Sequence, residues 1–329
     1  MLLLFNSIQE DQPGEKWEAL FKKAWPYYKK WFLSEGYRAR PGYLSSYSEL
    51  EKHMPELVPI YDQLAYLAGG GDLEARFLTM FCPPAYMSGC SQIAWTRPVP
   101  SLIRNYDYDY RMFEGVLLYT NWLQPVIGMS DCTWGLLDGM NASGLAASLT
   151  FGGRKIKGRG FGIPLVLRYV LETSKTTSEA VKILTRIPVH MAYNVTIIDQ
   201  NGQYATIFLS PDSSAKVLDN PIATNHQQLI DWHDYARATG TLERMEFLEN
   251  QLADPEETSR SLVQKFLHPP LYNRNHENSF GTLYTIEYEV EKQKITILWP
   301  NKTIVNSFKK YQECKETIML HPRIQSKLG

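Results

Sequence analysis

The pattern of apolar and polar residues changes close to residue 90, and this change limits the folds that the chain can adopt. Before it, apolar and aromatic residues recur every three or four positions over residues 17–31 and again over 45–68, which is typical of amphipathic helices. Pro26 lies inside the first pattern and is expected to kink or split that helix. After residue 90, short β-type runs are separated by Gly, Pro or Asn. The sequence therefore predicts a helical N-terminal segment followed by a sheet-rich part.

Several segments of the second part have the pattern of antiparallel hairpins. They are 133–151 around an NASG turn, 192–211 around Asn201-Gly202, and 281–300 as the last hairpin. A long helix is expected over residues 161–185 and further helices within 241–267. Hairpins interrupted by helices favour an α+β fold with sheet packed between helical layers. No GxGxxG follows a predicted strand and no GxxxxGK[ST] occurs, which argues against a doubly wound nucleotide-binding sheet.

Charge and hydropathy exclude several classes of function. The 329 residues include 34 Lys and Arg against 35 Asp and Glu, a net charge of -1, so we expect no nucleic-acid partner. No run approaches the roughly 20 apolar residues that a membrane span requires. The opening MLLLFNSI lacks the basic region and cleavage site of a secretory signal, so we expect a cytoplasmic protein.

The four cysteines, Cys82, Cys90, Cys132 and Cys314, have no CxxC spacing, and the seven histidines are scattered. Neither a disulfide framework nor a metal site is expected from this pattern. Each cysteine is then either a buried thiol or a nucleophile, and a lone cysteine is more often a buried thiol.

Cys90 lies at the junction between the predicted helical segment and the sheet-rich part, in the sequence MSGCS. No HExxH or GxSxG motif and no local Cys/His pair supplies a base for it. If the bond between Gly89 and Cys90 were broken, the new α-amino group would lie on the same residue as the thiol. An α-amine has an ordinary pKa of roughly 7.7–8.0, so it can act as a base near neutral pH. Glycine before the cysteine permits close attack on its carbonyl.

The order of the motifs around and after Cys90 resembles that of the cysteine N-terminal-nucleophile (Ntn) hydrolases. The motifs are Gly89-Cys90-Ser91, RNYDY at 104–108, GMNASGLAASLTFGG at 139–153 and ATNH at 223–226. The sequence is most similar to the acyl-coenzyme A:6-aminopenicillanic acid acyltransferase family, over about residues 55 to 290. Choloylglycine hydrolase, penicillin V acylase and N-acylethanolamine acid amidase are more distant relatives. The resemblance implies a four-layer αββα sandwich with a helical propeptide, residues 1–89, and a catalytic domain, residues 90–329.

The resemblance also implies roles for individual residues. Cys90 matches the nucleophile, and Gly89 matches the last residue of the leader. Arg104 and Asp107 match an Arg-x-x-Asp pair in which the guanidinium supports the thiol and the carboxylate holds the α-amine. Asn225 matches the donor to the oxyanion.

Three further residues complete the candidate site. Arg244, in LERMEFL, resembles a later arginine of the family, around which the spacing varies among relatives. Thr150 stands where the bile-salt and penicillin V enzymes carry asparagine, so we expect it to line the substrate pocket. Asp109 competes with Asp107, but only Asp107 has the matching three-residue offset.

The resemblance predicts an inactive precursor that cleaves itself and then hydrolyses a linear N-acyl amide, a small molecule, through a Cys90 thioester. No cofactor is expected. One alternative is an N-acyltransferase that uses the same nucleophile with a coenzyme A thioester as co-substrate. The other is a non-catalytic binding module on the same scaffold. We expect the cleaved leader to stay with the catalytic chain, although its amphipathic helices would also suit another partner. A homo-oligomer is compatible with the sequence.

Overall fold

A computed structural model describes residues 1–276 and 280–320, which form two large sheets and the helices that cover them. The larger sheet has the order β10-β9-β8-β7-β6-β5-β4-β1-β15, and all its pairs are antiparallel except β1 with β4. Its strands are β1 (Leu2–Gln9), β4 (Val116–Asn121), β5 (Pro125–Asp131), β6 (Gly135–Asn141), β7 (Leu145–Phe151), β8 (Tyr193–Asp199), β9 (Tyr204–Ser210), β10 (Ser213–Leu218) and β15 (Cys314–Met319).

The smaller sheet is antiparallel, with the order β11-β2-β3-β12-β13-β14. Its strands are β2 (Gly89–Trp95), β3 (Ser101–Tyr108), β11 (Ile222–Ala223), β12 (Gly281–Glu289), β13 (Lys294–Trp299) and β14 (Lys302–Ser307). Strands β2 and β3 pack face to face against β7 and β8 of the larger sheet. Alternate residues of each strand, such as Ala94 and Ile127, therefore fill a core between the sheets.

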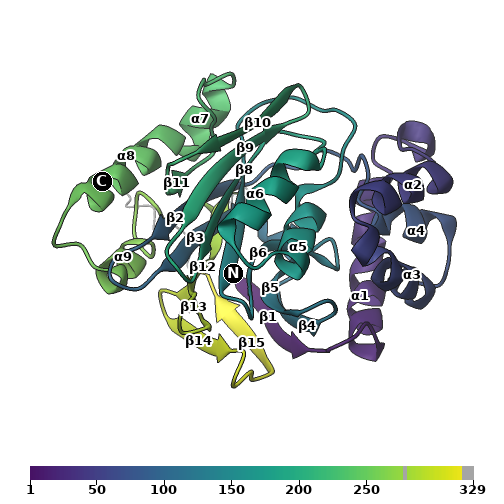
Figure 1. Ribbon diagram of the computed structural model, residues 1–329, viewed down its shortest axis with the longest axis horizontal. Helices are drawn as coiled ribbons and strands as arrows, with labels where there is room; N and C mark the ends of the chain where they lie inside the picture. Colours follow the sequence, from purple (N-terminus) through teal and green to yellow (C-terminus); the bar gives the residue numbers. More distant parts are fainter. Residues whose placement is uncertain (277–279, 321–329) are drawn as a thin grey trace, which may run out of the picture.

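Helices cover both outer faces of the paired sheets (Figure 1). Helices α5 (Ile163–Thr173) and α6 (Thr177–Arg186) pack on the larger sheet. On the other side, α8 (Thr241–Ala253) and α9 (Ser259–Lys265) cover the smaller sheet over a core that includes Ile93 and Leu248, and α7 (His233–Thr239) precedes α8. The predicted four-layer αββα fold is confirmed. No helix among the described residues is long and apolar enough to cross a membrane.

The N-terminal segment adds further helices beside α5, at the right of Figure 1. They are α1 (Glu15–Phe32), α2 (Tyr43–His53), α3 (Val58–Leu67) and α4 (Asp72–Leu78), with 3₁₀ turns at Tyr37–Ala39 and Pro55–Leu57. Aromatic side chains of α1 and α4, such as Trp17, Phe21 and Phe77, join the core that contains α5. This burial explains the aromatic content of the segment.

The prediction of an entirely helical N-terminal segment is wrong for residues 2–9. They form β1, an interior strand between β4 and β15. Leu3, Phe5 and Ser7 are buried whereas Leu2 and Leu4 are exposed, which is the two-residue period of a strand. The partner strand β15 lies about three hundred positions away, as the pair Leu2 and Met319 shows, so no neighbouring sequence signalled the pairing.

Three smaller predictions are wrong in part. Helix α1 continues through Pro26, which is exposed beside Lys22, so the carbonyl that proline leaves without a donor can bond to water. The expected helix over 161–185 is two helices, because Thr176 caps α6 with Glu179 in a capping box. The hairpin at 281–300 is followed by β14 and β15.

Candidate functional site

The pairing of β2 with β3 brings the predicted residues together. Cys90 lies opposite Tyr106 and Gly89 lies opposite Asp107 in the register. Neighbouring residues of a strand point to opposite faces, so the three-residue offset places Arg104 and Asp107 on opposite faces of β3. Arg104 faces the larger sheet with Cys90, whereas Asp107 faces the layer that contains α8.

The thiol of Cys90 is fully buried and has two polar neighbours. Arg104 Nη2 donates to Sγ at 3.1 Å, and Ser88 Oγ lies 3.5 Å from Sγ. Burial raises the pKa of the Cys90 thiol, while the positive charge of Arg104 favours the thiolate and opposes that rise. The site therefore contains a buried thiol with one permanent cation directed at it.

Arg104 is fixed by a carboxylate that the sequence analysis missed. Arg104 Nη1 donates to Asp138 Oδ2 at 2.8 Å, and both groups are fully buried. The hydroxyls of Tyr284 and Tyr288 each donate to Asp138 at 2.5 Å. Asp138 is in β6, and the two tyrosines are in β12, so no local motif identifies this cluster. Its effect is to hold the guanidinium against the sulfur.

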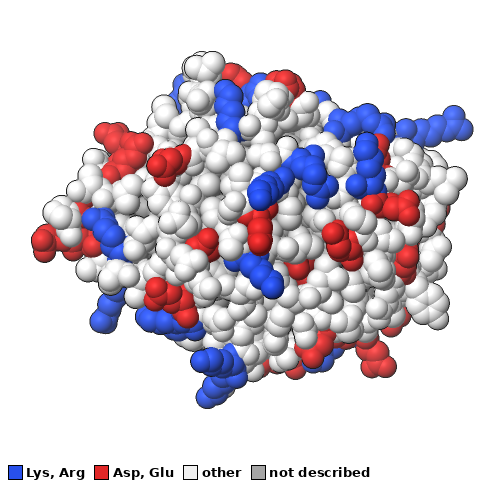
Figure 2. Space-filling model, in the orientation of Figure 1, with Lys and Arg blue, Asp and Glu red and all other residues white. Residues whose placement is uncertain are grey.

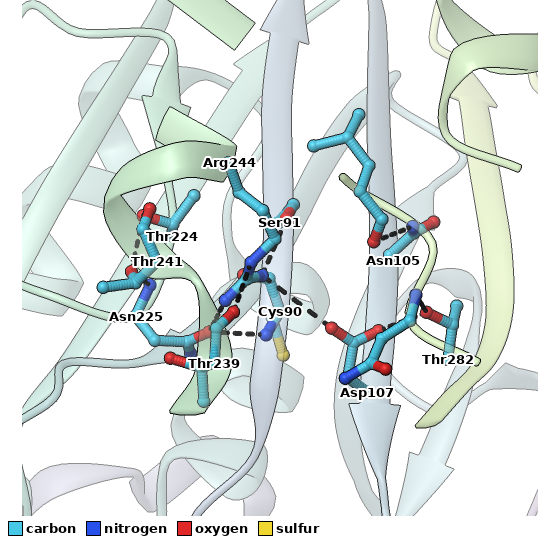
Figure 3. Close-up of polar contacts among 12 residues, drawn as sticks. Cys90, Ser91, Asn105, Asp107, Thr224, Asn225, Thr239, Thr241, Arg244 and Thr282 are labelled. Carbon is cyan, nitrogen blue, oxygen red and sulfur yellow. Dashed lines mark hydrogen bonds and ion pairs between the residues drawn. The ribbon is translucent and has the colours of Figure 1, made fainter. Parts of the chain in front are cut away.

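The backbone of Cys90 is held by side chains from two other elements (Figure 3). Its N–H donates to Asn225 Oδ1 at 2.7 Å. Its carbonyl accepts from Arg244 Nη1 at 2.5 Å, and Arg244 Nη2 donates to Asn225 Oδ1 at 2.8 Å. Arg244 is in α8, and it also donates to Ser91 Oγ at 2.8 Å. Arg244 therefore contacts both the backbone of Cys90 and the amide of Asn225, and its role in the reaction stays a prediction of the family resemblance.

The residue before Gly89 is held as well. Asn225 Nδ2 donates to the Ser88 carbonyl at 3.0 Å and to the Phe151 carbonyl at 3.2 Å. The Tyr235 hydroxyl, in α7, donates to the same Ser88 carbonyl at 2.6 Å. The amide expected to serve an oxyanion is thus occupied while the chain is intact. Tyr235 and Ser88 were missed by sequence reasoning, because only the fold brings α7 to this strand.

Asp107 lies beside Gly89 and not against the Cys90 nitrogen. Its carboxylate accepts from Thr282 Oγ1 at 2.6 Å and lies 3.8 Å from Arg244 Nη1. Burial raises the pKa of Asp107 to about 6, although Arg244 and Thr282 oppose the rise. The contact with the α-amine that the resemblance implied is absent from the intact chain, in which Asn225 accepts from that nitrogen.

Two further expectations concern Asp109 and Thr150. Asp109 accepts hydrogen bonds from Arg111 in the 3₁₀ turn Tyr110–Met112, away from the thiol, so of the two carboxylates it is Asp107 that lies beside Gly89. Thr150, in β7, donates to the Thr224 carbonyl at 2.8 Å. Its hydroxyl therefore supports the segment that carries Asn225, and its place in a substrate pocket stays a prediction.

Glycine at position 89 has a steric reason. A Cβ on Gly89 would lie 3.1 Å from Asp107 Cβ and 3.3 Å from its Oδ2, a tight approach.

Among the described residues, no group of three or more His, Cys, Asp or Glu is arranged to hold a metal ion. The chemistry that these residues can support is nucleophilic attack by sulfur.

The model of one protein family matches residues 95–303, that of the acyl-coenzyme A:6-aminopenicillanic acid acyl-transferase. The chain belongs to this family. The match includes Arg104, Asp107, Asn225 and Arg244 and begins after Cys90. Membership in the acyl-coenzyme A:6-aminopenicillanic acid acyl-transferase family makes the chain an enzyme of the amidase or acyltransferase type, and confirms the family predicted from the motifs. No curated protein matches the chain significantly by sequence.

Solved structures of three enzymes are similar to this one at low identity. A mutant of conjugated bile acid hydrolase from Clostridium perfringens has 16% identity and a TM-score of 0.46, and the match covers 71% of this chain and 97% of that one. Penicillin V acylase from Agrobacterium tumefaciens has 15% identity, a TM-score of 0.44, and coverage of 68% and 86%. The Caenorhabditis elegans ortholog of N-acylethanolamine-hydrolyzing acid amidase has 15% identity and a TM-score of 0.45, and the match covers 70% of this chain and 100% of that one.

Proposed function

We propose that this protein is a cysteine amidase made as a precursor that cuts itself between Gly89 and Cys90. The observation that carries the proposal is the convergence of side chains on one residue. Arg104 contacts the thiol of Cys90, Asn225 its N–H, and Arg244 its carbonyl. An inert cysteine inside a sheet would satisfy its N–H and carbonyl with neighbouring strands and would need no cation at its sulfur, whereas here side chains contact all three atoms.

In self-cleavage, the Cys90 sulfur attacks the carbonyl carbon of Gly89. The bond from that carbon to the Cys90 nitrogen then breaks, and the nitrogen takes up the proton that the thiol loses. The product is a thioester between Gly89 and the Cys90 sulfur. Water hydrolyses it to a Gly89 carboxylate and a free thiol. Asp107 lies beside Gly89 with its pKa raised to about 6, so its carboxylate is suited to exchange a proton at the breaking bond between Gly89 and Cys90.

The mature enzyme would use the freed α-amine of Cys90 as its base. The thiol attacks the acyl carbonyl of a linear amide, the amine leaves, and water hydrolyses the thioester. Release of residues 88 and 89 from the site would free the amide of Asn225 and the hydroxyl of Tyr235. Both groups now donate to the Ser88 carbonyl, so both would be available to an oxyanion.

The cleaved leader would remain bound to the catalytic chain. Strand β1 belongs to the leader and pairs with β4 on one side and β15 on the other. Its loss would open the larger sheet and expose the core around Phe5. We place the enzyme in the cytoplasm, where cysteines stay reduced, and all four cysteines are unpaired.

Acyl transfer to an amine is the second candidate, because the family description names an acyl-transferase. The thioester and the residues around it are the same, and an amine takes the place of water. Consumption of a coenzyme A thioester that depends on an added amine would identify this activity.

The test of the proposed function is the intact mass of purified protein over time. Wild type should yield an 89-residue and a 240-residue piece (329 minus 89), the larger beginning with Cys90. The two pieces should elute together under native conditions and separate in denaturant. Cys90→Ala should stay whole, whereas Cys132→Ala, which removes another buried thiol, should cleave. An active preparation in which the Cys90 nitrogen remains in a peptide bond would refute the proposal.

A further inference from the structure

A small cavity lies between the leader and the catalytic part, next to the residue opposite Cys90. Six of its lining residues matter here: Tyr28, Trp31, Tyr86, Tyr106, Tyr108 and Asp131. Its volume is about 20 Å³, which is room for roughly one group the size of a water molecule. Three of the aromatic rings come from the leader and two from β3. The cavity therefore exists only while both parts are present.

The lining has the composition of an aromatic cage. Aromatic faces attract an organic cation through the ring quadrupole, and several rings around one site are the usual arrangement for ammonium recognition. Tyr106 and Tyr108 have ring centroids 5.7 Å apart, and Tyr28 lies 6.1 Å from Trp31. Tyr86 is 8% exposed, and its hydroxyl has no hydrogen-bond partner among the described residues. A polar atom is thus left unsatisfied at the wall of the cavity.

Two carboxylates beside the rings lack a cation. Asp131 lines the cavity, and Glu114 is close behind it, since the Tyr28 hydroxyl donates to Glu114 at 2.5 Å and contacts Asp131 at 3.4 Å. Among the described residues, neither carboxylate forms an ion pair within 4.0 Å of a basic group. Burial, followed by the charge of Glu114, raises the pKa of Asp131 to about 7. Both carboxylates are half-buried, and a carboxylate partly removed from water is stabilised when a cation joins it.

We propose that this cavity binds an ammonium group of the substrate, so that the enzyme acts on amides whose acyl or amine part carries a positively charged nitrogen. The inference rests on the proposed function for the identity of the reacting bond. Asp131 supplies the opposite charge, the rings supply the cation–π faces, and the Tyr86 hydroxyl accepts a hydrogen bond from the ammonium.

The cavity and the thiol site share one neighbour, Tyr106. Tyr106 is paired with Cys90 in the register, and its ring is 5.1 Å from the Arg104 guanidinium that contacts the sulfur. Tyr106 and Asp131 line the same cavity, so Tyr106 adjoins both the cavity and the strand position opposite Cys90. The leader would then be more than a cover, because Tyr28, Trp31 and Tyr86 complete the site.

The first experiment measures binding without catalysis, in the Cys90→Ala protein. NMR titrations compare n-butylammonium with n-butanol, which has nearly the same shape and no charge. We expect the ammonium to bind at least roughly tenfold more tightly, a factor that corresponds to about 1.4 kcal/mol. Asp131→Asn should abolish this preference, and Asp234→Asn, which removes an exposed carboxylate on α7, should leave it unchanged. Equal binding of the two probes would overturn the proposal.

A second variant protects the test against misfolding. Trp31→Leu keeps the carboxylate and removes one ring, so it should weaken butylammonium binding while circular dichroism stays that of the parent. If Asp131→Asn does not fold, Trp31→Leu decides alone, and unchanged affinity in it contradicts the cage.

The second experiment uses the mature enzyme and isosteric substrate pairs. A 4-aminobutyryl anilide is compared with a pentanoyl anilide for the acyl side, and the octanoyl amides of 1,3-diaminopropane and butylamine for the amine side. In one of the two pairs, the charged substrate should have a kcat/KM roughly tenfold higher than its uncharged partner. Asp131→Asn should remove this difference. If both members of each pair are inert, the proposed amidase function fails while the binding result stands. If all are hydrolysed equally, the ammonium site of the substrate is disproved.

Discussion

At the scale of single residues, the geometry around Cys90 depends on the buried ion pair between Arg104, which contacts the thiol, and Asp138. Asp138 holds Arg104 in place, and both side chains are inaccessible to solvent. Burial raises the pKa of Asp138, and Arg104 with the two tyrosine hydroxyls opposes that rise. Such a pair costs desolvation energy, so its value lies in fixing one orientation of the guanidinium.

Replacement of Arg104 should therefore destabilise the fold as well as the site. In a Cys90→Ala background, Arg104→Gln leaves Asp138 buried without its cation, and we expect a loss of about 3–5 kcal/mol in the free energy of unfolding. Arg237→Gln, which breaks an exposed pair with Asp234, should cost about 1 kcal/mol or less. Urea denaturation of the Cys90→Ala parent and the two variants measures these losses. Similar losses in free energy of unfolding would show that the buried pair stabilises the fold no more than the exposed one.

Asp107 should set the pH dependence of self-cleavage. Its pKa is raised to about 6 by burial, and only the ionised form can accept a proton. The cleavage rate should therefore rise as the pH passes upward through about 6, and Asp107→Asn should slow cleavage by roughly 10²-fold or more.

The control for this prediction is Asp109→Asn, which removes the neighbouring carboxylate that pairs with Arg111. It should keep both the wild-type rate and the rise near pH 6. Rates would be followed by gel or mass spectrometry after transfer of precursor to each pH. A rise near pH 6 that persists in Asp107→Asn would assign the titration to another group.

At the scale of elements, β1 joins residues 1–89 to the rest of the fold as an interior strand of the larger sheet. Phe5 is fully buried, and its ring packs edge-on against Trp299 at 5.3 Å. Leu4, its neighbour in the strand, is 50% exposed because it points to the other face.

These two adjacent positions make a matched test. Phe5→Ala should lower the free energy of unfolding of the uncleaved protein by about 3–5 kcal/mol, since it leaves a cavity between the sheets. Leu4→Ala should change it by about 0.5 kcal/mol. Chemical denaturation followed by fluorescence gives both values. Equal effects would mean that β1 is not packed as an interior strand.

At the scale of the whole molecule, residues 1–89 and the described residues after them form one folded unit. The helices of the leader share a core with α5 and the larger sheet, and β1 closes that sheet. Charged side chains of both signs are interspersed over the face drawn in Figure 2, so this face carries no single-sign field. The net charge of -1 is consistent with that distribution.

The sequence by itself determined the local structure and the order of the chemical groups. Periodicity located the helices of the leader and the hairpins after residue 90, because side-chain alternation is a property of neighbours. The Gly89-Cys90 junction and the Arg104–Asp107 offset identified the family, and the predicted residues do meet in one place around Cys90.

Only the tertiary structure decided which distant groups meet. Strand β1 pairs with a segment at the other end of the chain, and Asp138 reaches Arg104 from another sheet. Tyr235 reaches Ser88 across 147 positions, and the small cavity combines residues of leader and catalytic part. Contacts of this kind are set by sheet order and by burial summed over the whole core. Neither leaves a periodic signal in the segments involved.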